Sequence, residues 1–178
     1  MSDNIYNPHG KEIRFMDSNY KELFRIPDGG YITITRADGE QLIRQCKFHG
    51  ECHVDIGMNL YHIDEFAERM AQNGSKYAPC PEPEIVHGYM ITDRMPVKSK
   101  MFVMAYHPSA AQKYVTWQGY IAPDGSIDKS RGYDWGHYWN DRSSASTDYF
   151  RRADSERTGI PYDHTQAYKN KSDRDNAR

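Results

Sequence analysis

Short stretches in which apolar and polar residues alternate, without any long apolar run, set the pattern of this chain. Residues 23–26 and 31–36 are rich in β-branched and aromatic side chains and flank a turn sequence at 27–30 that contains two glycines. Two such runs around a glycine-containing turn are typical of a β-hairpin. The alternation continues over 41–48 and 54–61. The first part of the chain therefore predicts a meander of about four short strands.

A helical spacing of apolar residues replaces this alternation directly after residue 61. Gly74 follows at the place where the C-terminal cap of a helix belongs. We expect a β-meander closed by one amphipathic helix over residues 13–74, with the helix packed on one face of the sheet. The apolar face of this helix consists of Ile63, Phe66, Ala67 and Met70.

The same order of elements is expected again over residues 86–159. A connector at 75–85 precedes them, and its three prolines predict a stiff, extended segment. Asp141 can cap the helix of this second unit, and Gly159 can end it. The expected strands are 89–92, 100–106, 114–121 and 133–139, and the expected helix is 142–157, with an apolar stripe of Ala145, Tyr149, Phe150 and Ala153.

The whole pattern predicts an α+β protein of two β-rich units, each an antiparallel meander closed by one amphipathic helix. Residues 1–12 are expected to form a flexible leader and residues 160–178 a polar tail. Leu, Val, Ile and Phe make only 27 of the 178 residues, below the ~20% at which disorder becomes an alternative. However, 14 Tyr, three Trp and eight Met, with a net charge of −2, favour a folded core built on rings.

Charge and apolar content exclude several classes of protein. The nearly balanced charge is untypical of a dedicated duplex-DNA binder, which has a strong basic excess, and of an acidic DNA mimic. The longest apolar runs, such as 101–106, are far shorter than the ~18 residues of a membrane span. The amino terminus has neither the basic start nor the apolar stretch of a signal peptide. These features predict a cytoplasmic protein without a membrane partner.

Several short segments of the sequence resemble known proteins. Residues 24–30 and 61–68 resemble the family of large polyvalent protein-associated domains, which accompany conjugative and other mobile genetic elements of bacteria. Residues 114–117 and 133–138 resemble the second half of similar proteins carried by such elements. That family has no established activity, but accessory proteins in the same setting include inhibitors of host defence nucleases. The resemblance therefore implies a non-enzymatic accessory protein that binds another macromolecule, of the anti-CRISPR or antirestriction type.

Aromatic and arginine side chains of the second unit are the candidate contacts for such a partner. The rings between 133 and 139 can form an interface, or they can fill the core of a chain that has few aliphatic residues. The arginines of 142–157 can meet phosphates, or they can share a solvated helix face with neighbouring acidic residues. A protein partner, such as a nuclease complex, is expected, with nucleic acid as a second candidate. The expected contact residues are Arg131, Trp135, Tyr138, Trp139, Arg142, Arg151 and Arg152.

Cysteine and histidine residues gather between positions 46 and 53. Zinc is bound by such side chains in tetrahedral sets, so one alternative is a zinc-stabilised structural module. The other alternative is a hairpin in which one cysteine packs as a small apolar residue and the histidines lie at the turn or the surface. Apart from this zinc ion, no cofactor is expected. The four candidate ligands are Cys46, His49, Cys52 and His53.

The predicted strand-to-helix junction carries the strongest candidate for catalysis. His137 can act as a general base, with Asn140 and Asp141 nearby, in a small metal-dependent enzyme of the nuclease kind. The alternative is a histidine packed among rings and an aspartate that caps the following helix. The chain has no Walker loop, nucleophile elbow, dinucleotide fingerprint or His-Glu-x-x-His sequence. The motifs therefore favour binding over catalysis.

Overall fold

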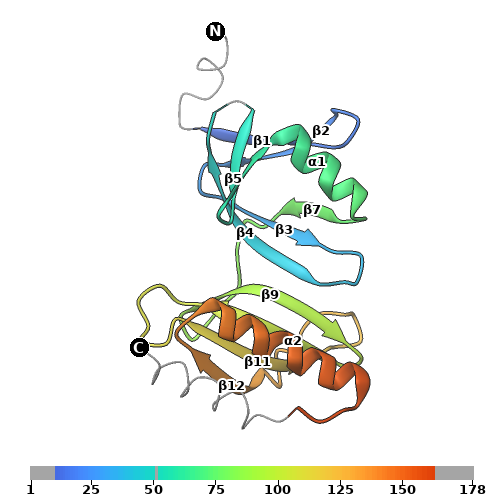
Figure 1. Cartoon of the computed structure of the whole chain (residues 1–178), viewed down its shortest axis with the longest axis vertical. Coiled ribbons are helices and arrows are strands. Elements are labelled where there is room, and N and C mark those ends of the chain that lie inside the picture. The colour runs from blue at the N-terminus through green and yellow to red at the C-terminus, as the bar shows by residue number, and fades with distance from the viewer. Residues whose placement is uncertain (1–10, 51, 163–178) are drawn as a thin grey trace. The chain divides into compact units, whose positions relative to one another are not determined.

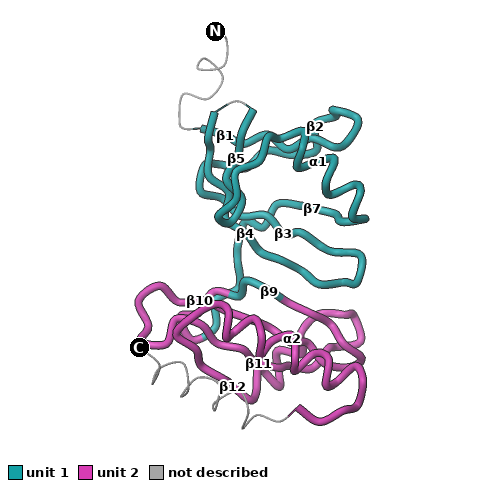
Figure 2. The backbone as a smooth tube through the Cα atoms, viewed as in Figure 1, with its two compact units in different colours: residues 1–86, 91–93 teal, residues 87–90, 94–178 magenta. Residues whose placement is uncertain are grey.

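The computed structural model describes residues 11–50 and 52–162. The chain divides into two compact units, which consist of residues 1–86 with 91–93 and of residues 87–90 with 94–178 (Figure 2). The expected leader and tail lie outside the described residues, except for residues 11–12 and 160–162. Within the part of the chain that is described, the protein is α+β, with mostly antiparallel sheets and two helices.

The first unit contains more strands than the expected meander. One additional strand, at residues 12–16, pairs with the first predicted strand, and the segment expected as a connector contributes a strand that pairs antiparallel with β3. The elements are β1 (Glu12–Met16), β2 (Glu22–Pro27), β3 (Tyr31–Thr35), β4 (Gln41–Phe48), β5 (His53–Ile56), β6 (Asn59–His62), α1 (Ile63–Gln72), β7 (Lys76–Pro79) and β8 (Ile85–Val86) (Figure 1).

Strand β3 lies between β4 and β7, and β5 pairs with both β4 and β6. Strands β1 and β2 form a sheet of their own. Helix α1 therefore does not end the unit, because the chain returns after it to add β7 beside β3. The turn between β2 and β3 needs its glycines, since a Cβ on Gly30 would lie 2.9 Å from the carbonyl oxygen of Pro27.

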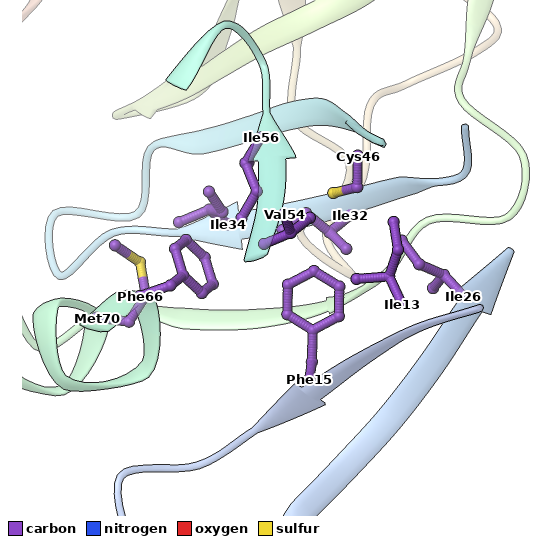
Figure 3. Close-up of a cluster of buried hydrophobic side chains, with 10 residues drawn as sticks. All are labelled: Ile13, Phe15, Ile26, Ile32, Ile34, Cys46, Val54, Ile56, Phe66 and Met70. Carbon is purple, nitrogen blue, oxygen red and sulfur yellow. The ribbon is translucent and has the colours of Figure 1, made fainter. Parts of the chain in front are cut away.

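The core of the first unit is built largely on rings and isoleucines (Figure 3). Phe15 is fully buried, and its ring lies 5.0 Å from that of Phe24, 5.9 Å from that of Phe66 and 6.0 Å from that of Tyr77. The apolar face predicted for α1 points into this cluster, since Phe66, Ala67 and Met70 are buried. The buried members are Ile13, Phe15, Ile26, Ile32, Ile34, Cys46, Val54, Ile56, Phe66 and Met70.

The second unit matches its predicted order of elements. Its four strands lie in the order β12-β11-β10-β9, and α2 packs on β10, β11 and β12 (Figure 1). The Asp141 carboxylate accepts a hydrogen bond from the backbone N–H of Ser144 at 2.8 Å, and Gly159 ends the helix with a φ of 75°. The elements are β9 (Tyr89–Val97), β10 (Lys100–Tyr106), β11 (Tyr114–Tyr120), β12 (Tyr133–Trp139) and α2 (Arg142–Thr158).

Helix α2 departs from the predicted apolar stripe in one respect. Ala145, Tyr149 and Ala153 are buried as expected, but Phe150 is 44% exposed. Two charged residues, Asp148 and Arg152, are buried in its place. The face of α2 that packs on the sheet is therefore partly polar, and its polar groups need partners within the unit.

No helix in the described part of the chain combines the length and the apolar character that a membrane crossing requires.

Replacement of Phe15 by Ala tests the ring cluster of the first unit. Phe15→Ala is expected to lower the free energy of unfolding by about 3–5 kcal/mol, because it leaves a cavity among three neighbouring rings. Denaturant unfolding followed by circular dichroism measures this loss. Leu23→Ala is the control, since Leu23 is 47% exposed and its truncation should cost less than about 1 kcal/mol. Equal losses in the two variants would contradict the assigned core.

Candidate functional site

A buried polar cluster joins α2 to two strands of the second unit. The Asp148 carboxylate lies 2.9 Å and 3.0 Å, through its two oxygens, from Nδ1 of His137 on β12. It also accepts a hydrogen bond from the hydroxyl of Thr116 on β11. Arg152 Nη1 donates to the backbone oxygen of Thr116 at 3.1 Å and to its Oγ1 at 3.2 Å. Thr116, Asp148 and Arg152 are all buried, so their mutual hydrogen bonds replace water.

The ionisation of this cluster follows from burial and from the charges around it. Burial by itself raises the pKa of Asp148, but hydrogen bonds from His137 and Thr116, together with the charges of His137 and Arg152, lower the pKa below its ordinary value. Burial lowers the pKa of Arg152, and the nearby Asp148 carboxylate, which by itself would raise this pKa, offsets only part of the decrease. Burial and the same carboxylate raise the pKa of Tyr162 to about 12. Tyr162 therefore keeps its proton near neutral pH.

A β-bulge in β12 places a tryptophan at the surface next to this cluster. Thr116 pairs with His137 and Gln118 with Asp134, so two residues of β12, Trp135 and Gly136, oppose Trp117 alone. Trp135 has a φ of 55°, which is rare for a bulky residue, and its side chain is 73% exposed. Outliers of this kind gather at functional sites.

Gly136 is required at the same bulge. A Cβ at this position would lie 2.8 Å from Nε1 of Trp117 and 3.1 Å from a ring carbon of Tyr138. The ring of Tyr133 stacks on Trp117 with a centroid distance of 5.8 Å. Close packing on the Trp117 face thus leaves no room for another side chain, and it fixes the backbone that presents Trp135.

A pocket of about 240 Å³ opens beside Trp135 in the second unit. Residues of β10, β11, β12 and α2 meet at its wall, and Arg152 links it to the buried polar cluster. Bulges next to a pocket commonly serve to aim a side chain at a ligand. The pocket is lined by Lys100, Phe102, Gln118, Trp135, Arg152, Ser155, Glu156 and Tyr162.

The structure separates the seven expected contact residues into two groups. Trp139 is 2% exposed and packs in the core of the second unit, and Arg152 is 5% exposed in the polar cluster. Both side chains are buried between α2 and the sheet, and Arg152 lies in the wall of the pocket. The exposed members are Arg131, Trp135, Tyr138, Arg142 and Arg151. The guanidinium of Arg131 lies over the ring of Tyr120, 3.4 Å from its centroid.

The candidate catalytic residues have different partners from those expected. His137 contacts Asp148, which lies about two turns of helix after Asp141. Asp141 instead uses one carboxylate oxygen for the backbone N–H of Ser144 and the other for its hydroxyl, both at 2.8 Å. Asn140 is exposed. Asp141 thus acts as the helix cap, which was the second interpretation of its position.

The candidate zinc ligands are spread over the hairpin of β4 and β5. Cys46 is fully buried in the core, where burial raises the pKa of its thiol to about 12, whereas Cys52 is exposed. His49 lies 3.6 Å from Asp55, and the ring of His53 contacts that of His62 at 5.1 Å. Across residues 11–50 and 52–162, no three His, Cys, Asp or Glu side chains are placed to hold a metal ion together.

The sequence did not identify Asp148 and Thr116 as members of the polar cluster, or Gln118 as a residue of the pocket. A signal was present for Asp148 and Arg152: each lies three residues after a member of the apolar stripe, Ala145 or Tyr149, and so shares its side of the helix. Their charges favoured a solvated face instead. No pattern in the sequence marks Thr116 or Gln118, since their roles depend on the strand pairing of β11.

Comparisons of the chain with protein-family models, with curated proteins and with solved structures found no match.

The buried carboxylate gives a test of the polar cluster. Asp148→Asn is expected to lower the free energy of unfolding by about 3–5 kcal/mol, because it leaves Arg152 buried without its counter-charge. Since the pKa of Asp148 is lower in the folded state, its contribution is complete above the ordinary carboxyl pKa near ~4 and disappears as the pH falls further. The variant should therefore lose less stability than the wild type between neutral and acid pH.

Denaturant titrations at several pH values measure both effects. Asp154→Asn is the matched control on the same helix, because the Asp154 side chain is 63% exposed and forms an ion pair with the exposed Arg157. Its replacement should cost less than about 1 kcal/mol. An Asp148→Asn variant as stable as the wild type, with the same pH dependence, would show that the cluster contributes nothing.

Thiol labelling tests the arrangement of the cysteines. At pH 8, Cys52 should react readily with a water-soluble thiol reagent, whereas Cys46 should react only after unfolding, because it is buried and its pKa is about 12. Mass spectrometry of peptides from the native and the unfolded protein identifies the labelled residues. Equal labelling of both cysteines in the native protein would disprove the burial of Cys46.

Proposed function

We propose that the protein is a non-enzymatic accessory protein of a bacterial mobile genetic element that acts in the cytoplasm by binding and inhibiting a host defence nuclease complex. The second unit makes the contact, with Trp135 as its central side chain. The setting comes from the resemblance of residues 13–158 to large polyvalent protein-associated domains and to similar proteins carried by mobile elements. The mode of action, binding through a protein surface, comes from the geometry around Trp135.

The observation that supports binding most strongly is the conformation of Trp135. A tryptophan that is 73% exposed loses apolar contact, and its φ of 55° adds backbone strain. A bulge packed against Trp117 holds it there. Tryptophan, tyrosine and arginine dominate the binding energy of protein interfaces. Arg131, on the loop before β12, is exposed as well, whereas Tyr138 of the same strand is exposed on the opposite face, beside Tyr89 and Trp117.

The charge of the second unit's exposed arginines adds a means of attraction to an acidic partner. Arg142 and Arg151 lie on α2, and both are exposed. Positive side chains at the rim of an interface chiefly accelerate association, whereas buried aromatic anchors set the lifetime of the complex. We therefore expect that replacing Arg142 or Arg151 changes mainly the association rate, with an effect that shrinks at high salt, whereas replacing Trp135 changes mainly the dissociation rate.

An enzymatic function has less support in the arrangement of the candidate residues. Both carboxylate oxygens of Asp141 bind Ser144, and His137 faces the buried Asp148. An Asp that orients a His is a part of many catalytic sites, so a metal-dependent activity at His137 is the second candidate. Its test is the His137→Ala variant, which would abolish an activity but leave most of a binding function.

Transformation of a bacterial strain that carries an active CRISPR–Cas or restriction nuclease tests the proposal. Expression of the chain should raise the transformation efficiency of a targeted plasmid at least tenfold, and it should have no effect in the same strain without the nuclease. Trp135→Ala should remove most of the effect, since loss of a central tryptophan commonly weakens an interface by about 2 kcal/mol or more, roughly 30-fold.

Met58→Ala is the matched control, because Met58 is 90% exposed and lies in the first unit. It should retain the full effect. Co-elution of the purified chain with the purified nuclease complex then shows whether the effect is direct. An absence of protection in every nuclease-proficient strain would overturn nuclease inhibition, and full protection by Trp135→Ala would overturn the assigned surface.

A further inference from the structure

Arg152 offers hydrogen-bond donors to the pocket that the protein itself does not use. Its side chain is only 4% exposed, and both of its hydrogen bonds come from Nη1, to the two oxygens of Thr116. Within the described chain, Nε and Nη2 of Arg152 make no hydrogen bond. Neither nitrogen is fully enclosed by protein, so an anionic group in the pocket can take these charge-assisted hydrogen bonds in place of water. Because Arg152 lines the pocket, a ligand can supply that group.

Among the described residues, Arg152 is the cation in the pocket wall with free donors for an anionic group, because the other charged residues nearby have partners within the protein. Lys100 and Glu156 neutralise each other, with Nζ and Oε2 2.7 Å apart. Asp148 is the counter-charge of Arg152, but its carboxylate lies 3.9 Å from Nη1, beyond hydrogen-bond distance, so it leaves the remaining donors of the guanidinium unused. Lys98 adds a further positive charge, since its Nζ donates to the backbone oxygen of Glu156 at 2.6 Å. The balance suits one anionic group and would not suit a cation.

The apolar part of the lining favours a flat ligand. Phe102, Trp135 and Tyr162 contribute three aromatic rings, and none of the described residues in the lining has an aliphatic side chain of the Ala, Val, Leu or Ile type. Flat rings gain most from stacking on another ring, and a nucleobase has such a face. Gln118 and Ser155 add a donor and acceptor pair and a hydroxyl, which can bond to the edge of a base.

The size of the pocket limits the ligand. Its volume of about 240 Å³ is below the ~300 Å³ at which pockets for drug-sized molecules begin. The pocket therefore has room for a single phosphate with one ring at the exposed rim, and not for a dinucleotide.

We propose that this pocket binds a nucleotide, with the phosphate on the guanidinium of Arg152 and the base stacked on Trp135. The source of the nucleotide is either a free mononucleotide or the 5′-phosphorylated end of a nucleic-acid strand, which offer the same phosphate and base. The proposal shares Trp135 with the proposed interface but does not depend on a nuclease partner.

Isothermal titration of the purified full chain with AMP tests the site. AMP should bind saturably, adenosine should bind about tenfold or more weakly because it lacks the charge-assisted hydrogen bonds, and inorganic phosphate should compete with AMP. A 5′-phosphorylated trinucleotide is the second arm: tighter binding than AMP identifies a strand end as the ligand, and weaker binding identifies the free nucleotide.

Two variants separate the phosphate contact from the stacking contact. Trp135→Ala should weaken binding of AMP and adenosine alike, by about tenfold. Arg152→Gln should remove the difference between AMP and adenosine. Because Arg152 is buried and this variant can fail to fold, Gln118→Glu provides the second test: it adds a carboxylate to the lining, so it should weaken AMP far more than adenosine. Circular dichroism checks the fold of each variant.

Met58→Ala should bind AMP as the wild type does, since Met58 lies in the other unit. An absence of AMP and trinucleotide binding at millimolar concentration would overturn the proposal, as would equal affinity of the wild type and Trp135→Ala for AMP. The titration uses the purified chain alone, so its failure is distinct from a failure of the transformation assay.

Discussion

The carboxylate of Asp148 is the group on which the second unit depends most. It receives hydrogen bonds from His137 of β12 and from Thr116 of β11, and it lies on α2 one turn before Arg152. A buried charge requires such partners, because the hydration that it loses on folding must be replaced within the protein. The same contacts fix how α2 is seated on the sheet. That seating brings Arg152 to the wall of the pocket beside Trp135.

The chain has few aliphatic residues, and the two units build their cores from different side chains. In the first unit, Phe15 contacts three other rings, and isoleucines of the strands fill the space around them. In the second unit, methionines and Trp139 pack against Tyr149 of α2, and the polar cluster takes the place of further apolar contact. Rings cover a large area for the number of side chains used, which compensates for the few Leu and Val. Polar contacts add geometric definition, because hydrogen bonds are directional.

The exposed position of Trp135 follows from the packing on the opposite face of its strand. Trp117 receives Tyr133 by stacking and meets Gly136 so closely that no Cβ fits. Two residues of β12 then oppose one of β11, and Trp135, with its left-handed backbone, is exposed at the pocket. The proposed interface and the proposed nucleotide pocket both use this ring. A side chain held by such packing loses little conformational freedom on binding, which favours affinity.

The sequence by itself determined the α+β class, the helix caps at Asp141 and Gly159 and most strand positions, because alternation, helical spacing and glycine turns act over a few residues. It missed β1, although residues 12–15 alternate polar and apolar side chains over four positions, and it missed the pairing of β7, which depends on its partner strand. Only the tertiary structure decided that Trp139 and Arg152 are buried while Trp135 is exposed. The reason is physical: a bulge and a buried ion pair arise from contacts between strands and a helix, and no single segment encodes them.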